Sequence, residues 1–160
     1  MSLVRRNIIP GFAIMITLIS SCSSKPDLVK EAAAIRNLLE QEQKAHFARD
    51  ADLFVAEFAD SMISVNRGVV KVPGLQENKE RISKYFSSVQ FIKWDDLADP
   101  IIRFSDDASL AYAVIQKEVI LTYPDTSGKP FYDTTRFAWT SVYRKHGGEW
   151  KVECNTSTNQ

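Results

Sequence analysis

The order of helix-forming and strand-forming segments constrains the fold of this chain more than any other feature of its sequence. Residues 27–47 are rich in Ala, Glu, Gln and Lys, and their apolar side chains recur at helical spacing, which is typical of an amphipathic helix. Residues 91–156 consist instead of strand-like stretches separated by turn residues. Because helices precede the strands rather than alternate with them, the sequence predicts an α+β domain with a mainly antiparallel sheet.

Two more helices and a hairpin are predicted between these segments. Asp50 is a candidate N-cap for a short second helix, and residues 77–89 carry the apolar spacing of a third. Strands over residues 62–65 and 69–72 flank the turn Asn66-Arg67-Gly68. The strands predicted after the third helix cover residues 91–104, with a bend near Pro100, and residues 110–123, 134–145 and 150–156.

The N-terminal residues predict a targeting segment. Arg5 and Arg6 precede an apolar run from Ile8 to Ile19, which is shorter than the ~20 residues of a membrane-spanning helix. The run ends in Leu18-Ile19-Ser20-Ser21-Cys22, which resembles the bacterial lipobox, although an uncleaved anchor or an ordinary signal peptide is the alternative. The resemblance implies cleavage before Cys22 and lipidation of its sulfur. The predicted organisation is a signal peptide over residues 1–21, a lipidated tether over residues 22–27 and a folded domain over residues 28–158.

Lipidation of Cys22 predicts a location in the bacterial cell envelope. Each buried CH₂ contributes ~0.8 kcal/mol, so two or three acyl chains anchor a protein stably. Ser23, rather than an aspartate, follows the cysteine, which favours the outer membrane over the inner one. The membrane, contacted through the lipid anchor, is therefore the first predicted partner.

Charge and residue types exclude several other classes of protein. The chain has 20 basic and 20 acidic residues and no basic cluster, so no nucleic-acid partner is predicted. Cys154 is the only cysteine besides Cys22, so the domain is expected to depend on its core rather than on an internal disulfide. Two histidines and one remaining thiol do not form a recognisable zinc set, and the acidic turns do not match a calcium loop. No metal and no cofactor are predicted.

Three segments carry a resemblance to a known superfamily. They are residues 47–52 (Phe-Ala-Arg-Asp-Ala-Asp), residues 58–61 (Phe-Ala-Asp-Ser) and residues 142–152, which end in Gly-Gly-Glu-Trp-Lys-Val. In this order and spacing they resemble the nuclear transport factor 2-like (NTF2-like) superfamily, in its SnoaL-like branch. The resemblance implies a cone: a strongly curved sheet wrapped around the long N-terminal helix, with a pocket at the open end. It also implies a homodimer, formed through the convex face of the sheet.

Two positions depart from the isomerases of that superfamily. The resemblance places Asn66 where the steroid isomerases have a proton-shuttling Asp, and Glu42 where they have an oxyanion-hole Tyr. Neither residue suits steroid-isomerase chemistry, because an amide cannot shuttle a proton and a carboxylate repels an enolate. His46 follows Glu42 by one helical turn, so the two are weak candidates for a catalytic base and its orienting group. An ordinary polar pair at the pocket rim, or a histidine at a helix end, is the favoured alternative.

The long strands suggest a polar pocket. If the loop over residues 124–130 closes symmetrically, Glu118 lies opposite Arg136, and the pair could line a pocket or form a surface salt bridge. The opposite face, with Phe137, Trp139 and Tyr143, is either the core under the first helix or the dimer patch. The full set of predicted pocket residues is Asn66, Tyr85, Trp94, Tyr112, Gln116, Glu118, Arg136 and Thr140.

Two functions are compatible with these observations. The favoured one is a non-enzymatic domain that binds a small hydrophobic molecule or a protein partner, with an apolar pocket and no strongly perturbed titratable group. The alternative is a small lyase, isomerase or hydrolase acting on a hydrophobic metabolite, with His46 and a carboxylate inside a closed cavity.

Overall fold

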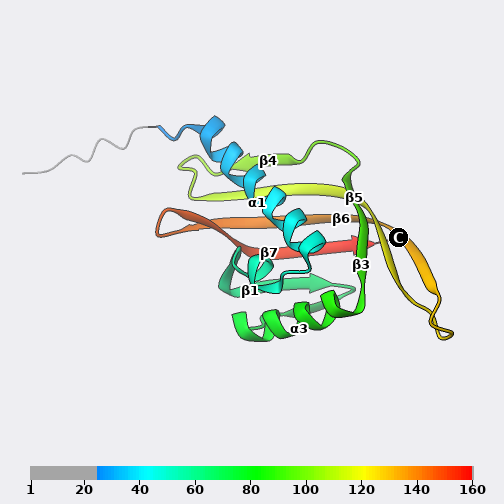
Figure 1. Ribbon diagram of the computed structural model, residues 1–160. Coiled ribbons are helices and arrows are strands. Elements are labelled where there is room, and N and C mark those ends of the chain that lie inside the picture. Colours follow the sequence, from blue (N-terminus) through cyan, green and yellow to red (C-terminus); the bar gives the residue numbers. More distant parts are fainter. Residues whose placement is uncertain (1–24, 160) are drawn as a thin grey trace, which may run out of the picture.

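The computed structural model describes residues 25–159 and shows one long helix lying across a sheet (Figure 1). Helix α1 spans Leu28–Ala48, and Asp27 caps it by accepting hydrogen bonds from the backbone N–H groups of Val29 and Lys30. It ends at Arg49, which adopts the left-handed conformation with φ 53°. The signal peptide and the lipidated Cys22 predicted from the sequence lie outside the described residues.

The three predicted helices are confirmed. Helix α2 spans Ala51–Val55, and the Asp50 side chain accepts from Leu53 N as its N-cap. Helix α3 spans Leu75–Ser88 and begins directly after Gly74. Within residues 25–159, no helix is both long enough and apolar enough to cross a membrane.

Seven strands form one mixed sheet. Their bounds are β1 Phe58–Asn66, β2 Val69–Lys71, β3 Gln90–Asp96, β4 Ile101–Phe104, β5 Leu110–Pro124, β6 Pro130–His146 and β7 Glu149–Asn159. The order is β2-β1-β7-β6-β5-β3, and β4 also pairs with β5. All pairs are antiparallel except β1 with β7, which are parallel. The predicted α+β class with a mainly antiparallel sheet is confirmed.

Two strand predictions are corrected. The single strand expected over residues 91–104 is two strands, because the chain leaves the sheet between Asp96 and Ile101 and both pieces pair with β5. The β5–β6 hairpin is longer than expected and reaches Pro124 and Pro130, because Asp125 accepts backbone hydrogen bonds across a tight turn.

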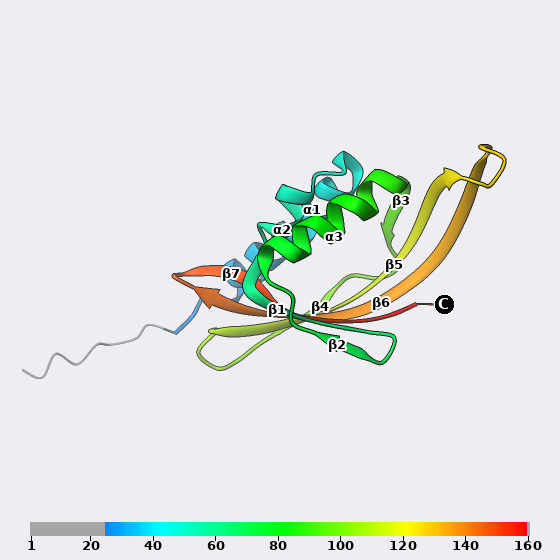
Figure 2. The same ribbon diagram turned by 90° about the horizontal axis from the view of Figure 1, so that it is seen from below.

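The sheet is strongly curved, and all three helices lie on its concave side (Figure 2). Alternate residues of β5, including Ile115 and Val119, point inward and are buried, as are Trp139 and Tyr143 on β6. They belong to one core cluster with Ile35 of α1. The face carrying Trp139 and Tyr143 is therefore the core rather than a dimer patch.

A clamp holds the first turn of α1 to the β6–β7 hairpin. The Glu31 carboxylate accepts hydrogen bonds from Lys145 Nζ at 2.6 Å and from Trp150 Nε1 at 2.8 Å. Lys145 Nζ also lies 4.9 Å from the centre of the Trp150 ring. The hydrogen bond from Lys145 is the main reason that the pKa of Glu31 is lowered, although burial of the carboxyl opposes this shift.

Candidate functional site

A cavity of about 230 Å³ lies between the helices and the concave face of the sheet. Its apolar wall consists of Phe54, Phe58, Met62, Ile82, Trp94, Phe137 and Trp139. Its polar lining consists of Glu42, His46, Ser64, Asn66, Arg81, Tyr85, Asn155 and Ser157. The cavity therefore combines an aromatic body with separate polar groups, the composition expected of a small-molecule site.

The polar groups lie at two ends of the cavity. Glu42 and His46 come from the last turns of α1 and are the interior pair. The mouth lies where β1 and β7 end, and there Asn66 Nδ2 donates to Ser157 Oγ at 2.7 Å. Arg81, on α3, is exposed at the mouth, and its Nη2 donates to Asn78 Oδ1 at 3.0 Å.

The imidazole of His46 is buried in an aromatic cage. It stacks on Trp94 with ring centroids 3.8 Å apart, and the rings of Phe54 and Phe91 contact it edge-on with centroids 4.9 Å away. Nδ1 lies 2.7 Å from the backbone carbonyl oxygen of Glu42. Because a carbonyl can only accept, Nδ1 carries the proton and Nε2 carries the lone pair. Burial lowers the pKa of His46 to about 4, so the ring is neutral at pH 7.

Glu42 is the second titratable group of the cavity. Burial raises its pKa to about 7, the nearby Asp96 adds to this shift, and Lys117 opposes it. Lys117 is itself 3% exposed and donates from Nζ to Asp96 Oδ1 at 2.6 Å. The interior end of the cavity is therefore close to an ion pair whose lysine is buried and whose aspartate is exposed.

A further buried carboxyl, Glu57, lies outside the cavity lining. Its pKa is raised to about 9, first by burial and then by the charge of Glu42, while Lys151 opposes the shift. Among the described residues its Oε1 has no hydrogen-bond partner. Sequence reasoning missed Glu57 and Lys117. The strand alternation contains a signal for Lys117, since it falls between the inward-facing Ile115 and Val119.

Two indole groups at the cavity have unmet hydrogen-bonding capacity. Trp94 and Trp139 are each 7% exposed, and both line the cavity. Neither Nε1 has an acceptor in the part of the chain that the structure describes. A buried donor without a partner is costly, so it calls for an explanation such as a bound molecule.

The structure divides the predicted pocket residues into two groups. Asn66, Tyr85 and Trp94 line the cavity, as do Glu42 and His46. The other five lie on the convex face and do not line it, which corrects the expected pocket: Tyr112, Gln116, Glu118, Arg136 and Thr140. The physical reason is the alternation of β5 and β6, which turns their inward neighbours toward α1 and these five away from it.

The predicted pairing of Glu118 with Arg136 is confirmed, but both side chains lie on the convex face of the sheet rather than in the pocket. The two residues are cross-strand partners, and Arg136 Nε lies 3.4 Å from Glu118 Oε2. Lys93 Nζ donates to Glu118 Oε1 at 2.8 Å. These groups form a surface network of charges, the alternative stated from the sequence.

Two expectations about acid/base groups are wrong. The Glu42 carboxylate does not orient His46, because the backbone carbonyl of Glu42 takes that role. The expectation of a pocket without strongly perturbed groups also fails, since both residues have shifted pKa values. No three His, Cys, Asp or Glu side chains within residues 25–159 are grouped so that they could hold a metal ion.

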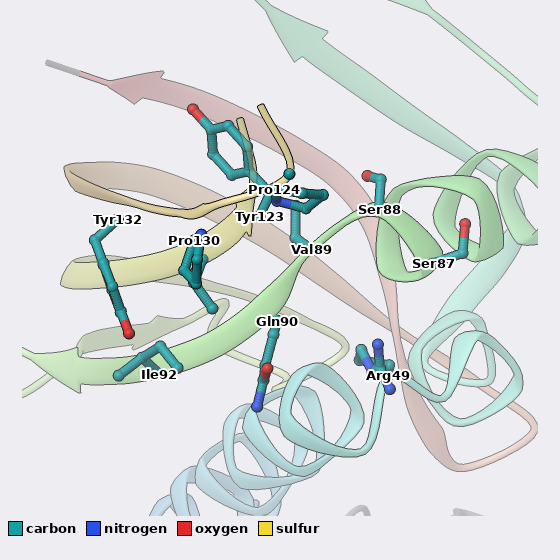
Figure 3. A pocket seen from close by; sticks show the side chains of 12 residues that line it. Arg49, Ser87, Ser88, Val89, Gln90, Ile92, Tyr123, Pro124, Pro130 and Tyr132 are labelled. Carbon is teal, nitrogen blue, oxygen red and sulfur yellow. The ribbon is translucent and has the colours of Figure 1, made fainter. Parts of the chain in front are cut away.

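A second hollow, of about 500 Å³, lies between the β5–β6 hairpin and the end of α3 (Figure 3). Tyr123 and Tyr132 form one wall, and Ser87 and Ser88 lie across from them. Both serine hydroxyls already donate to carbonyls of α3 at 2.8 Å. Among the described residues, no buried polar side chain lines this hollow, whereas the buried His46 lines the aromatic cavity. We therefore take the aromatic cavity as the candidate site.

No protein-family model matches the chain, and no curated protein matches it. Solved structures are similar to it. A ketosteroid isomerase-like protein from Erwinia carotovora atroseptica shares 18% identity and a TM-score of 0.65, over 81% of this chain and 96% of that one. An NTF2-like protein from Cytophaga hutchinsonii shares 14% identity and a TM-score of 0.65, over 81% and 98%.

A third structure, of a protein named as a dehydratase of the NTF2-like family from Streptomyces avermitilis, shares 14% identity and a TM-score of 0.64, over 81% and 96%. These likenesses show that the described domain has the NTF2-like fold. The fold is compatible with ligand binding and with isomerase- or dehydratase-like chemistry.

Proposed function

We propose that this protein is a lipid-anchored protein of the bacterial envelope whose NTF2-like domain binds a small, mainly apolar molecule without transforming it. One observation carries the proposal: an aromatic cavity is bordered by two indole N–H donors without acceptors among the described residues. The neutral imidazole of His46 adds an acceptor at the same cavity. A ligand that meets these groups would remove the cost of leaving them unpaired.

The arrangement of His46 supports binding over turnover. A general base works best when its pKa is near the operating pH, and the pKa of His46, at about 4, is far below neutrality. A catalytic histidine is also commonly oriented by a carboxylate, whereas His46 is held by a backbone carbonyl. The ring is suited to accept a hydrogen bond from a ligand and poorly suited to take its proton.

Filling the cavity tests this proposal. Ser64 lines the cavity, while its neighbour Val65 points to the convex face, so Ser64→Phe and Val65→Phe form a matched pair. Native mass spectrometry of the wild-type protein, purified from its own host, should show a co-purifying small molecule. Ser64→Phe should lose it and Val65→Phe should retain it. Equal retention by both variants, or a wild-type protein that carries nothing and binds no apolar probe, would overturn the proposal.

A second candidate function rests on Glu42. A carboxyl whose pKa is about 7 is roughly half ionised at neutral pH, which suits it to accept and return a proton at a carbon next to a carbonyl. The co-purified compound, incubated with the protein in D₂O, should then gain deuterium, and Glu42→Gln should abolish this uptake while retaining the compound. Absence of uptake with the wild-type protein would contradict this second candidate.

The anchor is proposed from the lipobox resemblance at Cys22 and has its own test. In the bacterial host, Cys22→Ala is expected to abolish labelling of the protein by a fatty-acid analogue, because the thiol that would accept the lipid is gone. Cys154→Ala is the matched control and should label normally. Undiminished labelling of Cys22→Ala would refute the anchor, and fractionation of labelled cells would test the outer-membrane location.

We also propose the homodimer expected from the family resemblance. The convex face exposes a row of apolar side chains from β4 and β5, namely Ile101, Tyr112 and Val114. Exposed apolar groups on one sheet face are typical of a protein–protein contact. The same native mass spectra would give the mass of the assembly, and a monomer at all concentrations would contradict the dimer.

A further inference from the structure

We infer, on the premise that the cavity binds a ligand as proposed above, that this ligand is a one- or two-ring molecule with a hydroxyl at its buried end and a carboxylate at its outer end. Three features of the cavity lead to this class: the fixed tautomer of His46, the volume and aromatic wall, and the guanidinium of Arg81, the one arginine among the described lining residues.

The residues at the buried end of the cavity favour a ligand group that donates a hydrogen bond. Since Nδ1 of His46 donates to the Glu42 carbonyl, Nε2 offers only a lone pair. A ligand hydroxyl can donate to Nε2, whereas an ether or a carbonyl oxygen at that position would place two lone pairs against each other. The hydroxyl oxygen could in turn accept from an indole N–H of Trp94 or Trp139, the donors without acceptors among residues 25–159.

The volume and the aromatic wall of the cavity limit the size and shape of the ligand. Its volume of about 230 Å³ is below the ~300–1,000 Å³ typical of sites for drug-sized ligands, so a compound of one or two rings is expected and a four-ring sterol is not. The wall is built largely from aromatic side chains, among them Phe54, Phe58 and Phe137. Such walls favour flat rings, which meet them by stacking or edge-on contact.

The residues at the mouth of the cavity favour a ligand with a negative charge. Arg81 is exposed there, and its hydrogen bond to Asn78 uses one guanidinium nitrogen, leaving other N–H groups for a carboxylate. The other mouth residues, such as Asn155 and Ser157, are neutral. Asp133, whose charge acts on Tyr85, does not line the cavity. Arg81 therefore supplies the charge that would distinguish an acid from its neutral analogue.

The test uses three probes and the full chain purified in detergent, with tryptophan fluorescence as the readout because Trp94 and Trp139 line the cavity. The probes are 4-hydroxyphenylacetate, its methyl ether 4-methoxyphenylacetate and its neutral analogue 4-hydroxyphenylacetamide. The first is expected to bind at least about tenfold more tightly than either of the others, because each analogue loses one charged or buried hydrogen bond.

Two variants test which residue is responsible for each of the two binding preferences, acid over amide and phenol over ether. Arg81→Gln should bring the ratio of acid to amide affinity to about one, while Lys84→Gln, which removes a charge from an exposed position of the same helix, should leave it unchanged. His46→Phe keeps an aromatic ring in the cage and should remove the preference for the phenol over its ether. Preferences that persist in both variants would overturn the inference.

A neutral probe separates this inference from the proposed function. Naphthalene has neither a hydroxyl nor a charge, so its binding requires only the apolar cavity, and Ser64→Phe should block it. If naphthalene binds but the acid is no tighter than the amide, the ligand class is wrong and the binding function stands. If neither naphthalene nor the acids bind, both fail.

Discussion

Glu57→Gln is expected to raise the free energy of unfolding by about 3 kcal/mol at pH 7. Burial is the main reason that the pKa of Glu57 rises from 4.5 to about 9, so the folded protein must hold this carboxyl protonated at neutral pH. Each pH unit above 4.5 costs about 1.4 kcal/mol until the folded pKa is reached. The amide keeps the shape of the protonated acid and removes this cost.

The pH dependence of the stability difference between Glu57→Gln and wild type shows whether Glu57 is protonated in the folded protein. Because the folded pKa of Glu57 is raised, the stability linked to its protonation is fully present below about pH 4.5 and is lost as the pH rises toward 9. The difference between variant and wild type should therefore be small near pH 4.5 and grow steadily up to pH 8. Urea unfolding across this range measures it, with the exposed Glu149→Gln as control. A difference that is constant with pH would show that Glu57 is already ionised in the folded protein.

Phe86→Ala is expected to lower the free energy of unfolding by about 3–5 kcal/mol. Phe86 is 1% exposed and is the central apolar contact of α3, with the rings of His46, Phe54 and Phe91 within 5.3–5.8 Å of its own. Removing the ring leaves a hole beneath α3 that the packed aromatic groups cannot fill.

Urea unfolding at constant pH measures this loss. Lys84→Ala, at an exposed position of the same helix, is the control and should change stability by less than about 0.5 kcal/mol. A loss of under about 1 kcal/mol for Phe86→Ala would show that α3 contributes little to the core. Because the same ring backs the His46 cage, the variant should also weaken binding in the cavity.

The fold was predictable because its signals are local. Asp50 marks the start of α2 by a capping preference that needs no tertiary structure, and the helical spacing in residues 27–47 needs only the chain itself. The break between β3 and β4 was not predictable in the same way. A bend near Pro100 is a local signal, but the separate pairing of the two pieces with β5 is a tertiary one.

The site was harder to predict because it depends on which sheet face is concave. The cross-strand partners Glu118 and Arg136 followed from the length of the loop, but polar residues occur on both faces of β5, including the buried Lys117. Asn66, Tyr85 and Trp94 come from three separate elements that only the curved sheet brings together. The tautomer of His46 depends on a backbone carbonyl, which no side-chain pattern encodes.

The clamp on Glu31 has a mechanical consequence. It fixes the first turn of α1, while the last turns of the same helix hold Glu42 and His46 at the cavity. A helix of 21 residues is about 30 Å long, so α1 is a rigid connection between the point where the chain enters the domain and the cavity. Force applied through residue 27 would be borne by the bonds to Lys145 and Trp150 rather than by the cavity wall. Figure 1 shows the ends of β1 and β7 on the opposite side of the domain from the start of α1, and Asn66 and Ser157 of these strands line the cavity. In the lipid-anchored protein that we propose, a molecule leaving the cavity at this end would therefore enter the surrounding water rather than the membrane.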